Sequence, residues 1–151
     1  MQFDRLNRWL TLIANLGVVA GLIFLGYEIR QNTAQMRGEA SYSITEGVND
    51  INAAIHQNEE LAEINHRGEY SFEELTPIEQ DRLRALWFSE LNLADYVLLL
   101  GEEGIENVQF DVVDYTVRKF RTQPGRRQFW DSAKDGWVGS EELYHRIEQT
   151  Q

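Results

Sequence analysis

The sequence has no cysteine, only two lysines and two prolines, and few cations of any kind. The absence of cysteine excludes disulfides, thiolate catalysis and cysteine-ligated metals. Asp and Glu number 25 against 14 Lys plus Arg, so the formal net charge is −11. Proteins that bind nucleic acid need cations to neutralise phosphates. The composition therefore predicts no nucleic-acid partner.

The local motifs of common enzyme classes are also absent. The sequence contains no P-loop, no GxGxxG fingerprint, no nucleophile elbow and no HExxH pair. Ser41, Ser43 and Ser71 have no neighbouring base in the sequence. We therefore expect no enzymatic activity, no catalytic residue and no bound cofactor.

A long apolar run lies near the amino terminus. Residues 9–25 carry no charge, and Thr11 and Asn15 are the polar side chains among them. From Trp9 to Tyr27 a helix would extend about 27 Å, close to the roughly 30 Å of a bilayer's hydrocarbon core. Aromatic residues at both ends suit the headgroup level of a membrane. The run thus predicts a transmembrane helix, with the lipid bilayer as a partner.

The two alternatives to a retained anchor are a buried core helix and a cleaved signal peptide. A buried core helix normally keeps a polar face, whereas no face is polar between Leu16 and Leu25. A cleaved signal peptide has a shorter apolar run followed closely by a small-x-small site, and the nearest such site, at 38–40, lies far downstream. A helix retained in the membrane fits the run best.

The charges that flank the run hardly decide its orientation. Arg5 and Arg8 precede it, and Arg30 and Arg37 follow it. Positive residues favour the cytoplasmic side of a membrane. The closer spacing of the first pair tips the prediction slightly towards a single-pass protein with its amino terminus inside.

Small and polar residues within the run suggest self-association. Gly17 and Gly21 form a GxxxG pair, which lets two helix backbones approach closely. Asn15 could add a hydrogen bond between helices. We therefore expect a homo-oligomer, with Asn15, Gly17 and Gly21 as the candidate self-association residues.

The chain after the anchor reads as helical throughout. Apolar residues continue at helical spacing from Ile29 to Ala62, and no proline occurs before Pro77. The sequence predicts an all-α protein in which an N-terminal transmembrane helix continues as a stalk into a small helical bundle. The expected parts are a membrane anchor helix at 1–30, a stalk helix at 31–66 that is straight or broken once, and a bundle at 76–151 packed on the stalk. The polar segment 67–75, which contains Gly68, should form the loop between the stalk and the bundle.

Several signals divide the bundle into helices. Thr76, Pro77 and Glu79 form a helix start with a capping box, and that helix should run to Leu100 as the centre of the bundle. A loop at 101–104 should precede a third helix. Pro124 and Gly125 should end that third helix, and Ser140 should cap the last one.

One pattern raises the possibility of a metal centre. Two E-x-x-H pairs occur, and in ferritin-like proteins such pairs converge with further carboxylates on two metal ions. Their positions at helix ends argue for solvated side chains instead. The candidate ligands are Glu63, His66, Glu90, Glu142 and His145, with Asp111 or Asp114 as a fourth carboxylate.

Charged residues on apolar helices need partners if they are buried. Glu90 and Asp95 lie on the most apolar helix of the bundle, and we expect structural ion pairs with Arg82, Arg84 or Arg118. A basic cluster could bind anionic headgroups or neutralise acidic helices of the same chain, and the overall acidity favours the second. Its members are Arg118, Lys119, Arg121, Arg126 and Arg127.

Two short motifs resemble a group of small bacterial proteins that have an amino-terminal membrane helix and no assigned activity. They are the helix ending at residues 27–33, YEIRQNT, and the segment from Gly125 and Arg126 to Phe129 and Trp130. The resemblance implies a bacterial membrane protein, hence the inner membrane, and it assigns no site residues.

Taken together, the sequence predicts a membrane-anchored helical interaction or scaffold protein that self-associates and presents an acidic domain to a protein partner. The first alternative is a helical carboxylate and histidine metal-binding protein. The second is a soluble oligomer that buries residues 9–25 between chains.

Overall fold

The structure is a computed structural model that describes residues 2–102 and 112–149. Six α-helices and one 3-10 helix account for most of this part of the chain, and no strand occurs in it. The all-α prediction is therefore confirmed. The chain divides into two compact units, residues 1–39 and residues 40–151.

Helix α1 (Gln2–His56) runs through the boundary between the units. In unit 1 every side chain that the structure describes is exposed. In unit 2 the same helix gains a buried face, on which Ala40 and Ile44 are 6% and 2% exposed. Val48, Ile51 and Ile55 continue that face against the core. The spacing of three and four residues is that of one helix stripe.

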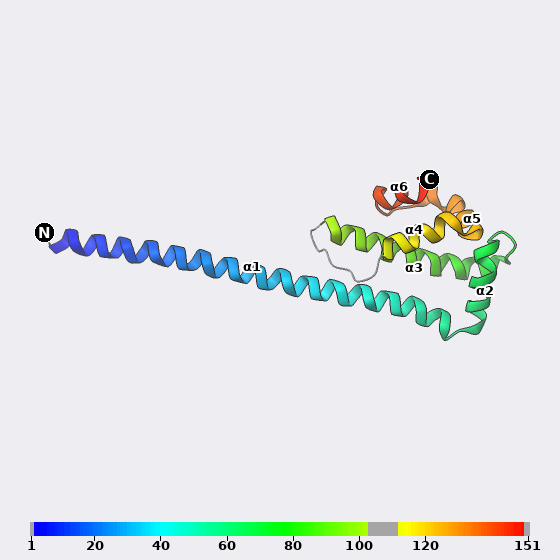
Figure 1. Cartoon of the computed structure of the whole chain (residues 1–151), viewed down its shortest axis with the longest axis horizontal. Helices are drawn as coiled ribbons and strands as arrows, with labels where there is room; N and C mark the ends of the chain where they lie inside the picture. Colours follow the sequence, from blue (N-terminus) through cyan, green and yellow to red (C-terminus); the bar gives the residue numbers. More distant parts are fainter. Residues whose placement is uncertain (1, 103–111, 150–151) are drawn as a thin grey trace. The chain divides into compact units, whose positions relative to one another are not determined.

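The rest of unit 2 is a bundle of short helices around α3 (Figure 1). Its elements in chain order are α2 (Glu59–Tyr70), α3 (Pro77–Glu102), α4 (Val112–Thr122), α5 (Pro124–Ala133), the 3-10 helix η1 (Lys134–Gly136) and α6 (Glu141–Glu148). Helix α3 contacts α2, α4 and α6, while α5 packs against α2 and α4. The prediction that the helix after Pro77 is central is confirmed.

Side-chain caps fix where three of these helices begin. The Thr76 backbone N–H donates to Glu79 Oε2 at 2.8 Å, so the predicted capping box at the start of α3 is confirmed. Ser140 Oγ accepts from the Leu143 N–H at 3.3 Å at the start of α6, also as predicted. Asn58 Oδ1 accepts from the Leu61 N–H at 3.0 Å and starts α2.

Aromatic rings fill the centre of the bundle. Trp87 from α3 and Phe129 from α5 are fully buried, and their ring centroids are 5.5 Å apart in an edge-on arrangement. Phe72 and Phe120 lie against the same pair. Edge-on contacts align ring edges with ring faces of opposite partial charge. This packing joins α3, α4 and α5 to the segment after α2.

Helices α2 and α5 approach each other backbone to backbone. A Cβ on Gly125 would lie 1.7 Å from the Gly68 carbonyl oxygen. A Cβ on Gly68 would lie 2.2 Å from Leu83 Cδ1, on α3. At Gly125 the overlap is with backbone atoms, so only glycine fits there without moving a helix, whereas at Gly68 the Leu83 side chain would have to shift.

Some predicted boundaries were wrong, because tertiary packing decided them. The segment 67–75 was expected to be a loop, yet α2 continues to Tyr70 because Gly68 packs inside the bundle. The predicted stalk at 31–66, expected to be straight or broken once, has one break at Gln57 and Asn58, between the end of α1 and the start of α2. Gly101 lies within α3. The rest of the loop predicted to follow it, at 103–104, and Asp111 lie outside the described residues.

We predict that Gly125→Ala destabilises the bundle by about 2–3 kcal/mol, because the added methyl group overlaps the Gly68 carbonyl and forces α5 away from α2. The matched control is Gly101→Ala, also within a helix, where a Cβ meets nothing within 4 Å. That change should stabilise α3 by up to about 1 kcal/mol. Urea denaturation of the full-length chain, followed by circular dichroism, measures both. Equal midpoints for the two variants would contradict the close approach.

Candidate functional site

The most exposed apolar surface of the chain is the first half of α1. Among the described residues, α1 is the one helix long and apolar enough to cross a membrane, and none of its apolar window is buried. Trp9 is 64% exposed and Tyr27 is 65% exposed, so both predicted interfacial rings are available to lipid. A core helix of a soluble protein would instead be mostly buried in its own chain.

The polar side chains within this segment differ in whether their hydrogen-bonding groups have a partner. Thr11 Oγ1 donates to the Asn7 carbonyl oxygen at 2.9 Å, one helical turn earlier. Such a bond within the helix lets a threonine enter a bilayer without an unpaired donor. Asn15 makes no such bond within the described residues. Its amide faces outward, as do the open positions at Gly17 and Gly21, around which an added Cβ would meet nothing within 4 Å.

The candidate metal ligands are not gathered. Glu63 and His66 lie on α2, Glu90 on α3, and Glu142 and His145 on α6. Among the described residues, no group of three or more His, Asp or Glu side chains could hold a metal ion. Several of these side chains are in other contacts within unit 2. Glu63 faces Arg67, Glu142 accepts from Arg146 at 2.8 Å, and His66 packs edge-on against Tyr70.

Glu90 is the centre of a buried ion cluster. Arg126 is 0% exposed, and its two terminal nitrogens donate to the two Glu90 oxygens at 2.6 and 3.1 Å. Lys119 Nζ lies 3.2 Å from Glu90 Oε2. Burial lowers the pKa of Lys119, and the Glu90 carboxylate opposes that shift. The guanidinium carbon of Arg126 also lies 4.6 Å from the Trp87 ring centroid.

The cluster extends to the edge of the bundle through hydrogen bonds. Arg126 Nη2 reaches Glu69 Oε1 at 3.5 Å, and Asn65 Nδ2 donates to the same oxygen at 3.4 Å. Asn65 Oδ1 in turn accepts from Trp87 Nε1 at 2.9 Å. One connected network thus joins α2, α3, α4 and α5, and its carboxylates and cations neutralise one another. This arrangement explains packing rather than chemistry.

The sequence predicted the wrong partners for Glu90 and Asp95 on α3. Glu90 pairs with Arg126 and Lys119, and not with Arg82, Arg84 or Arg118. Asp95 forms no ion pair with any residue that the structure describes; it accepts hydrogen bonds from the backbone N–H and the hydroxyl of Ser140, at the start of α6. Both acids are therefore held by residues that follow them by 29 positions or more.

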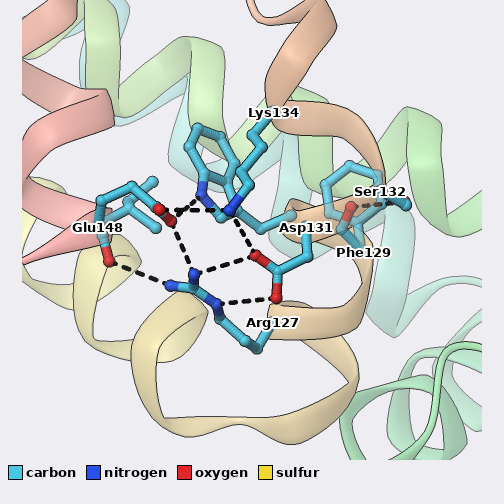
Figure 2. A network of polar contacts seen from close by, with 8 residues as sticks. Arg127, Phe129, Asp131, Ser132, Lys134 and Glu148 are labelled. Carbon is cyan, nitrogen blue, oxygen red and sulfur yellow. Dashed lines mark hydrogen bonds and ion pairs between the residues drawn. The ribbon is translucent and has the colours of Figure 1, made fainter. Parts of the chain in front are cut away.

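A second charged network holds α6 to α5 (Figure 2). Arg127 forms two bonds with Asp131, at 3.0 and 3.1 Å, and a third with Glu148 at 2.8 Å. Glu148 also accepts from Trp130 Nε1 at 2.9 Å and from Lys134 Nζ at 3.3 Å. Although burial opposes the shift, these donors hold the pKa of Glu148 below its usual value. The network fixes the last described helix.

Most residues of the predicted basic cluster contact polar groups of the same chain. Lys119 and Arg126 contact Glu90, and Arg127 contacts Asp131 and Glu148. Arg121 donates to the Arg146 carbonyl oxygen near the end of α6. Arg118 lies over the Tyr115 ring at 5.7 Å and is exposed. Neutralisation by carboxylates of the same chain, the favoured interpretation, accounts for three of the five residues, Lys119, Arg126 and Arg127.

We predict that Arg126→Met costs about 3–5 kcal/mol of unfolding free energy, because Glu90 then stays buried with Lys119 as its one cation. The exposed pair of Arg82 and Glu60, 2.8 Å apart, is the control, and Arg82→Met should cost at most about 1 kcal/mol. Adding Glu90→Leu to Arg126→Met should recover part of the loss. Denaturation midpoints of the four chains give these values, and a loss in Arg126→Met no larger than in Arg82→Met would refute the cluster.

The capping box of α3 should give a measurable pH dependence. The hydrogen bond from Arg67, with those from Thr76, lowers the pKa of Glu79 from its usual 4.5 to about 2. A carboxylate with a lowered pKa adds stability above about pH 4.5, and that stability is lost as the pH falls towards about 2. Glu79→Gln should reduce the fall in melting temperature between pH 5 and pH 2. Glu74→Gln, exposed and without a hydrogen bond among the described residues, should leave it unchanged.

Comparison of the chain with protein-family models, with curated proteins and with solved structures gave no match. The candidates for function are therefore taken from the structure itself, and there are two. The ion cluster around Glu90 is buried and already neutralised. The apolar segment of α1 is exposed over its whole length.

Proposed function

We propose that the protein is a membrane-anchored helical interaction or scaffold protein. The observation that carries this proposal is the exposed apolar segment of α1, bounded by Trp9 and Tyr27. None of the apolar window of α1 is buried, and water would be a poor solvent for it. A bilayer covers all its faces at once, and a helix satisfies its own backbone hydrogen bonds there.

The charge distribution supports a division of roles between the units. Residues 1–39 carry three acidic residues and four arginines, a formal charge of +1. Residues 40–151 carry 22 acidic residues against ten Lys and Arg, a formal charge of −12. Anionic membrane surfaces repel such a unit, whereas a protein with a basic surface attracts it. The proposed partner of unit 2 is therefore a basic protein surface.

The finer features of the proposal rest on the sequence. The YEIRQNT motif after the anchor supports a bacterial inner-membrane location, through the resemblance described above. The paired arginines before the anchor support an amino terminus in the cytoplasm. In that orientation the acidic unit 2 lies outside the cytoplasm. The exposed small and polar residues of α1 support self-association of the anchor.

Membrane extraction tests the anchor. We expect the full-length chain to stay in the membrane pellet after an alkaline carbonate wash and to be released by detergent. Val18→Arg, at the middle of the apolar run, should release a large fraction into the soluble phase, because a central arginine costs about 2.5–3.5 kcal/mol on insertion scales.

The matched control is Thr45→Arg, on the exposed side of α1 within unit 2, which should stay in the pellet. Recovery of the unaltered chain in the soluble fraction without detergent would refute the anchor. If that soluble chain were also oligomeric, the apolar segment would be buried between chains instead.

A further inference from the structure

Two cations of unit 2 form no ion pair or hydrogen bond within the described residues. Unit 2 holds ten Lys and Arg side chains, and seven of them form ion pairs with an Asp or Glu of the same chain. Arg121 donates to a carbonyl oxygen of α6. The remaining two are Arg84 and Arg118. Because 22 acidic residues face only ten cations in this unit, a shortage of carboxylates does not explain these two exceptions.

Arg84 differs from Arg118 in its surroundings. Arg118 is exposed and lies over the Tyr115 ring, which is itself 50% exposed. Arg84 is half-buried on α3, and its guanidinium carbon lies 5.2 Å from the Phe72 ring centroid and 6.0 Å from that of Phe129. Both of these rings belong to the core. A cation held against core rings is partly removed from water, so it attracts a carboxylate more strongly than a fully solvated arginine does.

The donors of Arg84 reach the surface of the bundle. A guanidinium has five N–H donors, and in the part of the chain that the structure describes none of those of Arg84 makes a hydrogen bond. Unbonded side-chain nitrogens that are shut off from solvent occur on Arg121, Arg126 and Trp137, and not on Arg84. Another molecule can therefore meet the Arg84 guanidinium.

Phe72 also holds a second free donor, the side-chain amide of Gln128. On α5, Gln128 Oε1 accepts from the backbone N–H groups of Phe72 and Glu73 at 2.8 and 3.3 Å. These two bonds fix which way the amide faces, and Gln128 Nε2 has no partner among the residues described. Phe72 thus contacts Arg84 through its ring and Gln128 through its backbone. Guanidinium and amide N–H groups both donate, so the pair suits an oxyanion.

Phe88 gives this surface an apolar border. It lies one helical turn after Arg84, is half-buried, and has its ring centroid 5.2 Å from that of Phe129. We call Arg84, Phe88 and Gln128 the Arg84 patch. Its one cation balances one negative charge, which fits a carboxylate better than a phosphate dianion. A ring beside the cation suits a carboxylate that is flanked by apolar groups, as on the surface of a protein.

We propose that the Arg84 patch binds an Asp or Glu side chain of the protein partner of unit 2, with the carboxylate on the Arg84 guanidinium and the Gln128 amide. The proposal rests on the proposed function, in which that partner presents a basic surface. Broad charge attraction brings the partner to unit 2 without selecting one orientation. An acidic side chain within the basic surface is repelled by the −12 charge of unit 2, so its place beside a free cation fixes how the partner docks.

Two five-residue peptides with blocked ends test the assignment. Both have lysine at each end and phenylalanine at the second and fourth positions, and the central residue is aspartate in one and asparagine in the other. Overall charge alone would make the more cationic asparagine peptide bind more tightly to this acidic chain. We expect instead that the aspartate peptide binds the full-length chain in neutral detergent about five- to tenfold more tightly, as measured by isothermal titration calorimetry.

Variants of the two free arginines identify the site. Arg84→Gln should reverse the order of the two peptides, while Arg118→Gln, the matched control, should leave the order unchanged. Arg84→Lys keeps the charge and should reduce the preference for the aspartate peptide, because an ammonium cannot donate two parallel hydrogen bonds to a carboxylate. Thermal melts followed by circular dichroism show that each variant is folded.

The outcomes separate this proposal from the proposed function. Tighter binding of the asparagine peptide to the unaltered chain, or a preference for aspartate that survives Arg84→Gln, would overturn the Arg84 patch and leave the basic partner standing. Absence of binding by both peptides would overturn the patch and the basic partner together.

Discussion

The bundle depends on one buried contact, that between Arg126 and Glu90. The guanidinium meets the carboxylate with two hydrogen bonds, and its plane lies against the rings of Trp87 and Phe120. Both charges are removed from water, so each would be costly without the other. Because Arg126 comes from α5 and Glu90 from α3, the pair specifies which helices meet and at what height. Lys119 adds α4 to the same point, which makes the contact a meeting place of three helices rather than a link between two.

The contact between Arg126 and Glu90 is accompanied by a close approach of the α5 and α2 backbones. Gly125 immediately precedes Arg126, and its missing side chain allows α5 to rest on the Gly68 carbonyl of α2. Gly125 and Arg126 therefore act together. The glycine allows α5 to lie close to α2, and in this position the Arg126 guanidinium is within hydrogen-bonding distance of Glu90. The aromatic rings then exclude water from the pair, and exclusion of water strengthens the attraction that remains.

Much of the helical pattern could be predicted from the sequence because its causes are local. The capping box of Thr76 and Glu79, and Ser140 at the start of α6, are formed by residues a few positions apart, and both occur as predicted. The apolar run of α1 could be recognised from its composition and its length alone. The partner of Glu90 could not be predicted, since helical spacing shows which residues share a face but not which helix that face meets. The same limit explains why Gly68 falls in the predicted loop. Its carbonyl oxygen packs against Gly125, which is 57 positions away in the sequence.

The way α6 is held has a consequence for the order in which unit 2 forms during synthesis. Arg121 and Arg127 donate to carbonyl oxygens at the end of α6, and Trp130 donates to Glu148. Of the described helices, α6 is the last to leave the ribosome, so these donors lack their partners while α5 is already outside. Leu143 and Ile147, both buried, are also missing from the core at that stage. If α1 enters the membrane early, as proposed, unit 2 therefore stays incomplete until α6 has been synthesised and has packed.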